Sequence, residues 1–318
     1  MSGLGSVPSA DGVTVRVPAK INLALAVGDV REDGYHELAT VFHAVDLYDE
    51  ITVRPSGAWS VRAGGVQGVP TTRSNLALKA AMALHAHLVR RGRRPGEVSI
   101  EIDKKIPVAG GMAGGSADAA AALVGCAALW DAELSRDDLI GIAAGIGSDV
   151  PFALTGGTAL GTGRGEIVSP VLTRMTLTWV LAMAGSGLST PEVFAECDRL
   201  RAGVDDSALS VPRADADAMV AALRSGDVDE VGAALANDLQ PAAFSLYPKL
   251  RRTVRAGVDA GAVAGIVSGS GPTVALLCRD LPQASDVAAA MSSSGTCEGV
   301  RVASGPAHGA RLIGGSLR

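Results

Sequence analysis

The sequence predicts an α+β protein built from two domains. The chain has 318 residues, more than one typical domain needs and enough for a sizeable core. Segments that alternate apolar and polar residues, as half-buried strands do, are interspersed with Ala- and Leu-rich segments typical of helices. The pattern changes near residues 168–170. We therefore expect one domain at 1–168, whose first twelve residues form a loose tail, and a second at 169–318.

The composition describes an ordered globular protein. Hydrophobic residues make up 47% and aromatic residues only 3%, so the core must consist of Ala, Val, Leu and Ile. A net charge of −5 gives no overall basic field, which argues against a nucleic-acid partner. No apolar run reaches the ~20 residues of a membrane span, and the first dozen residues lack a signal-peptide pattern.

The cysteines fit neither zinc sites nor a disulfide framework, because they are widely separated and form no C-x-x-C pair. They are Cys126, Cys197, Cys278 and Cys297. We expect free buried thiols in a reducing compartment, and hence a cytoplasmic enzyme with no membrane partner.

The first strands are expected at 13–17 and 21–27, with an interruption at residues 18–20. Lys20 and Asn22 lie two residues apart and therefore share a face of a regular strand. They form either a surface pair or part of the lining of a cleft.

A polar turn at 31–36 follows and carries Tyr35 and His36, which could simply pack within the turn. Further strands are expected at 37–45 and 49–54, and His43 within the first of them has a structural role. Residues 55–72 look irregular, and an amphipathic helix is expected at 75–90.

A glycine-rich loop is the most informative part of the chain. It separates an expected strand at 98–103 from an expected buried helix at 116–130. Its glycines would let backbone N–H groups approach an anion at the start of the helix, although a purely structural turn uses the same residues. The loop matches neither the P-loop nor the Rossmann pattern. We expect Ser116 to be the N-cap, with its hydroxyl within reach of a phosphate or metal.

Asp149 follows a further expected helix at 135–144, capped by Ser135. Local sequence favours Asp149 as another helix cap. The alternative is a carboxylate at the edge of a cleft, placed to accept a proton. Residues 156–165 are dense in glycine and should form a hairpin or loop beside the same cleft.

The second half mixes helices with strands that we expect to be antiparallel, as in an α+β domain. The residues 268–273 form a second glycine turn, either a tight hairpin or a close approach to a ligand. Strands are expected at 176–184, 265–268, 273–278 and 299–303, and helices at 191–201, 215–225, 228–239, 247–260 and 284–292.

Five segments in order make the chain resemble the GHMP kinase superfamily, and the resemblance covers nearly the whole chain. They are residues 18–23, 31–38, 107–120, 147–151 and 268–272. The first two are similar to the branch that acts on 4-diphosphocytidyl-2-C-methyl-D-erythritol. The resemblance implies a two-domain GHMP kinase fold, with an N-terminal ribosomal-protein-S5-domain-2-like ATP domain and a C-terminal ferredoxin-like α+β domain.

The resemblance also implies an ATP-dependent phosphorylation of the 2-hydroxyl of that cytidine diphosphate compound, in non-mevalonate isoprenoid synthesis. It assigns Asp149 as general base and Lys20 as its partner. It implies Mg²⁺ held through ATP, with Ser116 as the one protein group that could touch the metal. Because the loop has no lysine of its own, we expect Lys20 and the metal to supply the positive charge for the phosphates, with Lys104 as a further candidate. The ATP-binding residues would be Asn75 near the base and Pro107, Val108, Ala109, Gly110, Gly111, Met112, Ala113, Gly114, Gly115, Ser116 and Ala117.

On the acceptor side, the resemblance implies that Tyr35 and Phe194 sandwich the cytosine while His36 binds its polar edge. Asn22 and Thr190 complete this group. A monomer or a homodimer is expected. The alternatives are another GHMP kinase, which would not need this aromatic set, or a non-catalytic binding protein on the same scaffold, which should lack Lys20 or Asp149.

The chain departs from the superfamily pattern within the loop, where Met112 replaces the common Leu. Ala109, Ala113 and Ala117 stand where relatives carry glycine or a second serine. Because alanine adopts a positive φ only at a cost, we expect negative φ at all three.

Overall fold

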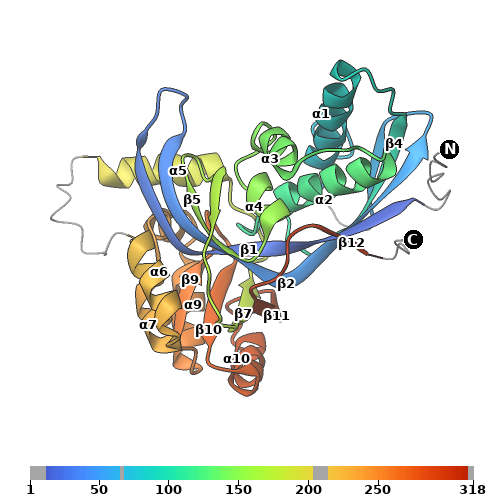
Figure 1. Ribbon diagram of the computed structural model, residues 1–318. Coiled ribbons are helices and arrows are strands. Elements are labelled where there is room, and N and C mark those ends of the chain that lie inside the picture. Colours follow the sequence, from blue (N-terminus) through green and yellow to red (C-terminus); the bar gives the residue numbers. More distant parts are fainter. Residues whose placement is uncertain (1–11, 65–67, 203–213, 314–318) are drawn as a thin grey trace.

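Two sheets organise the computed structural model, which describes residues 12–64, 68–202 and 214–313 (Figure 1). The expected tail lies outside these residues except for Gly12. The strands of the larger sheet follow the order β12-β1-β2-β4-β3. In addition, β5 pairs with β2, β6 pairs with β5, and β8 pairs with β1. Its strands are β1 (Val13–Val30), β2 (His36–Ser56), β3 (Ser60–Ala63), β4 (Glu97–Asp103), β5 (Thr158–Thr162), β6 (Ile167–Pro170), β8 (Ala236–Asn237) and β12 (Arg311–Ile313).

The long antiparallel pair β1–β2 runs across the molecule (Figure 1). The sequence predicted a break at residues 18–20, and the structure instead has one continuous strand with a register shift between Pro18 and Ala19. Such a bulge accommodates a proline, which has no N–H for the ladder, without ending the strand. A second shift lies between Asn22 and Ala24, so both irregularities flank Lys20 and Asn22.

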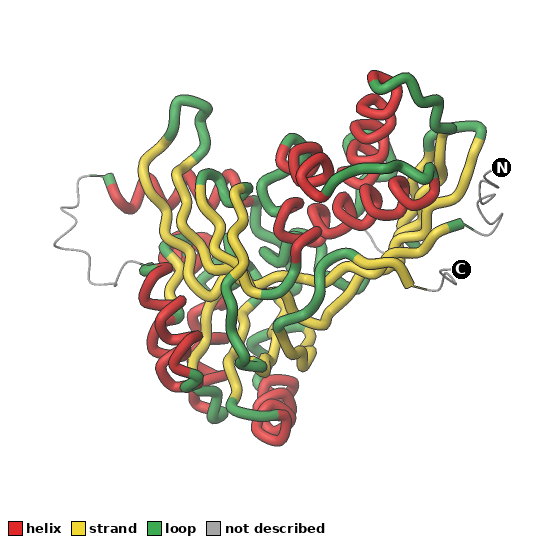
Figure 2. The backbone as a smooth tube through the Cα atoms, viewed as in Figure 1, coloured by secondary structure: helices red, strands yellow, loops and turns green. Residues whose placement is uncertain are grey.

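Helices of the first half of the chain cover one face of this sheet (Figure 2), where α1, α2 and α4 contact the strands and α3 packs on these helices. The helix α2, which contains Gly125, packs tightly on the sheet: a Cβ added to Gly125 would lie only 2.8 Å from a methyl group of Val53. Its mostly alanine face therefore lets the helix approach the strands closely, as its all-round apolar sequence predicted. The helices are α1 (Leu76–Arg90), α2 (Gly114–Leu129), α3 (Arg136–Ala144) and α4 (Val150–Thr155).

Of the helix caps expected at Ser135 and Ser116, the first is confirmed and the second is wrong. Asn75 caps α1, although the sequence placed it within the helix. Ser135 caps α3 and forms a capping box with Asp138. Ser116, however, lies inside the first turn of α2, and Ala113 is the N-cap residue. The helix begins earlier because Ala113 adopts a left-handed conformation that turns the loop directly into Gly114.

The smaller sheet is antiparallel throughout, as predicted, in the order β11-β7-β10-β9. The helix expected at 228–239 is shorter in the structure and ends at Ala234. Leu235 adopts an extended conformation, and the next two residues pair with β1 as β8. The elements are β7 (Leu177–Met183), β9 (Ala264–Val267), β10 (Val274–Cys278), β11 (Gly299–Gly305), α5 (Thr190–Arg201), α6 (Ala216–Ser225), α7 (Val228–Ala234), α8 (Gln240–Leu246), α9 (Lys249–Asp259) and α10 (Leu281–Ser293).

A continuous core connects the two sheets. Buried side chains of β1, β2, α1 and α2 form one cluster with Trp179 of β7 and Leu277 of β10. Strands β8 and β12, both from the second half of the chain, complete the larger sheet. The four cysteines are free thiols, three of them buried and Cys297 half-buried. Across the described ranges, no helix has both the length and the apolar character to cross a membrane.

Candidate active site

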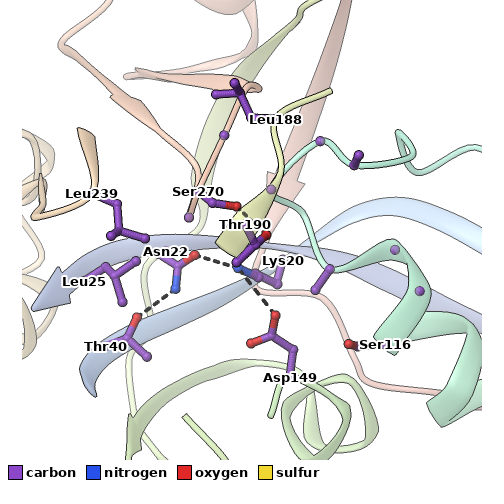
Figure 3. A pocket seen from close by; sticks show the side chains of 18 of the residues that line it. Lys20, Asn22, Leu25, Thr40, Ser116, Asp149, Leu188, Thr190, Leu239 and Ser270 are labelled. Atoms are coloured by element: carbon purple, nitrogen blue, oxygen red, sulfur yellow. Dashed lines mark hydrogen bonds and ion pairs between the residues drawn. The ribbon is translucent and has the colours of Figure 1, made fainter. Parts of the chain in front are cut away.

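Residues from all five segments singled out in the sequence line one cavity of about 560 Å³, here called the central cavity (Figure 3). Strands β1 and β2 provide one wall, and the glycine loop before α2 provides another. Asp149, the start of α5 and the turn between β9 and β10 close it. The chain therefore brings together segments separated by more than two hundred residues.

Lys20 lies at the base of this cavity with its side chain only 8% exposed. Its Nζ donates to Asn22 Oδ1 at 2.7 Å and lies 3.8 Å from Asp149 Oδ2. Asn22 Nδ2 in turn donates to the Thr40 hydroxyl at 2.8 Å, which donates to the Ala24 carbonyl at 2.7 Å. Burial lowers the pKa of Lys20, and the Asp149 carboxylate opposes that shift. The chain of hydrogen bonds thus fixes the position of an ammonium group beside a carboxylate.

Asp149 occupies the N-cap position of α4, yet its side chain makes no capping hydrogen bond. Pro151 stands in the first turn of that helix and removes one N–H that a cap would have served. The carboxylate instead faces Lys20 and is 31% exposed to the cavity. The Asp149 side chain therefore does not cap α4, although the local sequence favoured that role.

The glycine loop has positive φ at Ala109 and Ala113, with values of 51° and 56°. The prediction of negative φ is wrong at these two positions and holds at Ala117, which is helical. Each left-handed alanine costs about 1–2 kcal/mol, so tertiary contacts must hold the loop. Gly110 O accepts from the Thr273 N–H at 3.2 Å, and Gly111 O accepts from the Ser268 hydroxyl at 3.1 Å.

The turn between β9 and β10 packs against this loop so closely that glycine is required on both sides of the contact. A Cβ on Gly111 would lie 2.1 Å from Ser268 O, and one on Gly269 would lie 3.2 Å from Lys20 Nζ. Asn237 Nδ2 holds the turn by donating to the carbonyls of Val267 and Gly269. The turn is therefore both a hairpin and a wall of the central cavity.

A second cavity of about 580 Å³, the outer cavity, adjoins the first. The two share Asp149, Thr190 and Phe194 among their lining residues. His36 stacks on Phe194 at 4.9 Å between ring centroids, and its Nε2 lies 2.9 Å from Asp198 Oδ1. Asp149 therefore stands at the junction of the two cavities.

Tyr35 also lines the outer cavity and is 54% exposed. The Arg164 guanidinium lies over its ring, 4.9 Å from the centroid. Sequence reasoning missed Arg164, Asp198 and Thr40. Asp198 stands one helical turn after Phe194 on α5, a spacing that could have indicated it, whereas nothing local distinguishes Arg164 in its glycine-rich hairpin.

A side cavity of about 210 Å³ lies on the other side of the glycine loop. Asn75 lines it, as do Pro107, Val108 and Lys104. The Asn75 side chain caps α1 by accepting from the Ala77 N–H at 2.8 Å, and it donates to the Pro70 carbonyl at 2.8 Å.

Lys104 is not free to bind phosphates in the central cavity. It is 3% exposed, and its Nζ contacts Asp49 Oδ2 at 2.5 Å and Asp118 Oδ2 at 2.9 Å. Asp49 also accepts from the N–H groups of Lys105 at 2.6 Å and Ile106 at 2.8 Å. Asp118 has one oxygen without a partner among the described residues. Burial raises its pKa to about 7.

The central cavity offers oxygen ligands to a metal ion but no dedicated cage. Within the described residues, no group of three or more His, Cys, Asp or Glu side chains converges. The Ser116 hydroxyl and the Asp149 carboxylate line the same cavity, and a Cβ on Gly147 would lie 3.9 Å from Ser116 Oγ. This donor set fits Mg²⁺, which is held largely by substrate phosphates and water.

Comparisons with known proteins agree with this architecture. Residues 75–157 match the GHMP kinases N terminal domain, and residues 219–297 match the GHMP kinases C terminal domain. A crystal structure of 4-(cytidine 5'-diphospho)-2C-methyl-D-erythritol kinase is 32% identical, with a TM-score of 0.71 over 95% of this chain and 100% of that one. A homoserine kinase from Cytophaga hutchinsonii has a TM-score of 0.78 at 21% identity, covering 98% and 100% of the two chains.

Curated relatives are closer in sequence. The 4-diphosphocytidyl-2-C-methyl-D-erythritol kinase of Mycolicibacterium smegmatis is 56% identical over 97% of this chain and 98% of its own length. That of Nocardia farcinica is 58% identical over 98% of each chain. The predicted α+β fold and family are confirmed. The chain belongs to the GHMP kinases and, within them, to the family of the 4-diphosphocytidyl-2-C-methyl-D-erythritol kinases.

Proposed function

We propose that this kinase transfers the γ-phosphoryl group of ATP to the 2-hydroxyl of 4-diphosphocytidyl-2-C-methyl-D-erythritol. The products are ADP and the 2-phosphate, an intermediate of non-mevalonate isoprenoid synthesis. One observation carries the proposal: the Asp149 carboxylate lies where the central and outer cavities meet, 3.8 Å from the Lys20 ammonium. A phosphoryl donor in one cavity and an acceptor in the other would come together at this carboxylate.

Asp149 would act as the general base for the acceptor hydroxyl. Phosphoryl transfer depends mainly on an oriented nucleophile and neutralised phosphate oxygens. The carboxylate accepts the hydroxyl proton as the new P–O bond forms. Lys20 holds the carboxylate in place by their 3.8 Å contact, and phosphate charge entering the cavity would favour the ammonium form of the buried lysine.

The glycine loop and the first turn of α2 would bind the ATP phosphates. The first N–H groups of a helix lack intrahelical acceptors and carry a partial positive charge, which suits an anion. Ser116 in that turn would contact Mg²⁺, whose contribution is to neutralise charge on the transferring phosphoryl group. The side cavity beside Asn75 and Pro107 would take the nucleoside part of ATP.

The outer cavity would hold the cytidine end of the acceptor. Tyr35 and Phe194 offer aromatic surfaces for the cytosine, and His36 offers a ring nitrogen for its polar edge. The Thr190 hydroxyl, 2.9 Å from Ser270 Oγ, lies at the boundary with the central cavity and would contact the erythritol part. Asn22 would help to position the same hydroxyl-bearing end.

Another GHMP kinase activity is the main alternative. The likeness to the homoserine kinase does not favour it, since at 21% identity that likeness concerns the fold alone. Such a kinase would not need Tyr35, His36 and Phe194 together. A non-catalytic protein on this scaffold is disfavoured by the Lys20–Asp149 pair.

A coupled ADP-release assay with four acceptors tests the proposal. We expect turnover with 4-diphosphocytidyl-2-C-methyl-D-erythritol and none with galactose, homoserine or mevalonate. Turnover with one of the last three and none with the cytidyl compound would contradict the proposed substrate. No turnover with any acceptor would contradict the kinase activity itself.

A further inference from the structure

The acceptor proposed above carries a diphosphate, and the outer cavity presents two carboxylates to it. Asp149 and Asp198 both line that cavity. Two phosphate charges brought beside two carboxylates would repel them in a partly enclosed space unless a cation lies nearby. The cavity therefore needs a positive group for an acceptor of this chemistry.

Two lining residues of the outer cavity can be cationic, His36 and Arg164. His36 Nε2 already lies 2.9 Å from Asp198, and its ring is stacked on Phe194. Lys20 lines only the central cavity and is bonded to Asn22 beside Asp149. Arg164 is therefore the cation that stands next to the acceptor and carries its charge at every physiological pH.

The surroundings of Arg164 leave its guanidinium available. Residue 164 lies in the hairpin between β5 and β6, with its side chain 27% exposed. Glu166 forms its one ion pair within the described residues, at 3.6 Å from Nε. The other Glu166 oxygen accepts from the Arg164 backbone N–H at 2.6 Å, so that carboxylate is held within the hairpin. The guanidinium carbon lies over the Tyr35 ring, 4.9 Å from its centroid, a contact that uses none of the guanidinium N–H groups as donors to an oxygen.

We infer that Arg164 binds the diphosphate of the acceptor, with Tyr35 positioning the guanidinium by stacking. The inference rests on the proposed function for the identity of the acceptor. A planar guanidinium matches two phosphate oxygens at once, which a lysine cannot do. Its placement above Tyr35 links recognition of the diphosphate to recognition of the cytosine. Arg164 is in this sense a specificity residue for nucleoside diphosphate acceptors.

Calorimetric binding of CDP and of cytidine tests the inference without depending on turnover. Both titrations use protein saturated with a non-hydrolysable ATP analogue, so that CDP cannot occupy the ATP site. We expect CDP to bind wild-type protein more tightly than cytidine. In Arg164→Gln, CDP affinity should fall by about 10- to 100-fold while cytidine affinity stays within about twofold. Arg164→Lys should recover only part of the loss.

A matched control removes one positive charge outside the cavity. Arg199 is on α5, 65% exposed and paired with Glu196, and it does not line the outer cavity. Arg199→Gln should therefore leave both affinities within about twofold of wild type. An equal loss of CDP affinity in this variant would mean that overall charge, and not Arg164, attracts the diphosphate.

Two other outcomes would overturn the inference. Equal losses of CDP and cytidine affinity in Arg164→Gln would show that Arg164 only supports Tyr35. Unchanged affinities for both would show that it does not contact the ligand. Each outcome is distinct from failure of the proposed function, which appears as wild-type protein that does not phosphorylate 4-diphosphocytidyl-2-C-methyl-D-erythritol.

Steady-state kinetics provide a second readout. The KM for the acceptor should rise by about 10- to 100-fold in Arg164→Gln, while the KM for ATP stays within about twofold. Arg164 does not line the central or the side cavity, so ATP binding should not depend on it. A rise in the KM for ATP of the same size would contradict the assignment.

Discussion

The Lys20 ammonium and the Asp149 carboxylate face each other at 3.8 Å, one from the core of the larger sheet and the other from the start of α4. Their exposures differ, because Lys20 is nearly buried and Asp149 opens to both cavities. The lysine can therefore act on the carboxylate from behind while the carboxylate meets a ligand. This asymmetry gives each residue of the pair a separate role.

Replacing the carboxylate tests its role as a base. Asp149→Asn keeps the size and the N-cap position but cannot accept a proton, so kcat should fall by about 10²-fold or more. Thermal unfolding should be close to wild type, because Asp149 makes no capping hydrogen bond. Ser135→Ala, which removes a real cap, should show the opposite pattern of lowered stability and nearly normal kcat. Near-normal turnover in Asp149→Asn would remove Asp149 from the chemistry.

Thr40 should act as a positioning residue for Asn22 and Lys20. Thr40→Val preserves the shape but leaves Asn22 Nδ2 without its acceptor, which should cost about 1–3 kcal/mol of the free energy of unfolding. We also expect kcat to fall by about tenfold as the Lys20 ammonium loses its fixed position. Urea unfolding and kcat are measured together, with Thr52→Val as the control, because among the described residues the Thr52 hydroxyl contacts only the Thr14 hydroxyl, away from the cavity. A loss of stability with unchanged kcat would confine Thr40 to folding.

Replacing Ala113 or Ala117 with glycine should change the stability of the fold in opposite directions. Ala113→Gly should stabilise the fold by about 0.5–1 kcal/mol, because it relieves a positive φ of 56°. Ala117→Gly should destabilise it by about 1 kcal/mol, because residue 117 is a buried helical position. Urea denaturation of the two variants gives the comparison. Equal destabilisation by both would show that Ala113 does not hold the left-handed conformation.

His43 should make the fold sensitive to acid. Burial lowers its pKa from the ordinary value of 6.5 to about 3. Between those pH values the unfolded chain binds a proton that the folded protein does not. The free energy of unfolding therefore falls as pH falls from 6.5, by up to about 1.4 kcal/mol per pH unit.

The measurement compares urea unfolding of wild type and His43→Gln at about pH 5 and about pH 7.5. His43→Gln will lose stability at both pH values because its contact with Thr158 changes. Its further loss at the lower pH should be smaller than that of wild type by about 2 kcal/mol. Equal acid sensitivity in the two proteins would show that His43 takes up a proton in the folded state.

Asp118 should change the free energy of unfolding with pH in the direction opposite to His43. Its pKa rises from 3.8 to about 7 in the fold, chiefly through burial. Between these values the folded protein holds a proton that the unfolded chain releases, so this contribution to stability is lost as pH rises toward 7. Asp118→Asn stays neutral and should gain stability relative to wild type between about pH 5 and about pH 8. A constant difference between the two proteins over that range would contradict the shift.

The candidate site could be located from the sequence to a large extent. Alternation along β1 placed Lys20 and Asn22 on one face, and glycine spacing located the loop before α2. The resemblance then selected Asp149, Tyr35, His36 and Phe194, and all of them line the two adjoining cavities. These results were within reach because strand alternation, helix starts and glycine turns depend on residues close together in the chain.

Only the tertiary structure decided how distant residues share the site. Local sequence left Asp149 as a helix cap, and the contact with Lys20 shows otherwise. Lys104 is withdrawn from the central cavity by Asp49 and Asp118, and Arg164 enters the outer cavity from a hairpin with no distinguishing pattern.

The loop conformation was decided in the same way. Ala109 and Ala113 keep a costly positive φ because Ser268 and Thr273 hold the loop from the other sheet. The preference of alanine is local, whereas these contacts join residues more than a hundred and fifty positions apart. Local preferences of about 1–2 kcal/mol therefore determine the elements of this protein, and long-range contacts that outweigh them determine the geometry of its site.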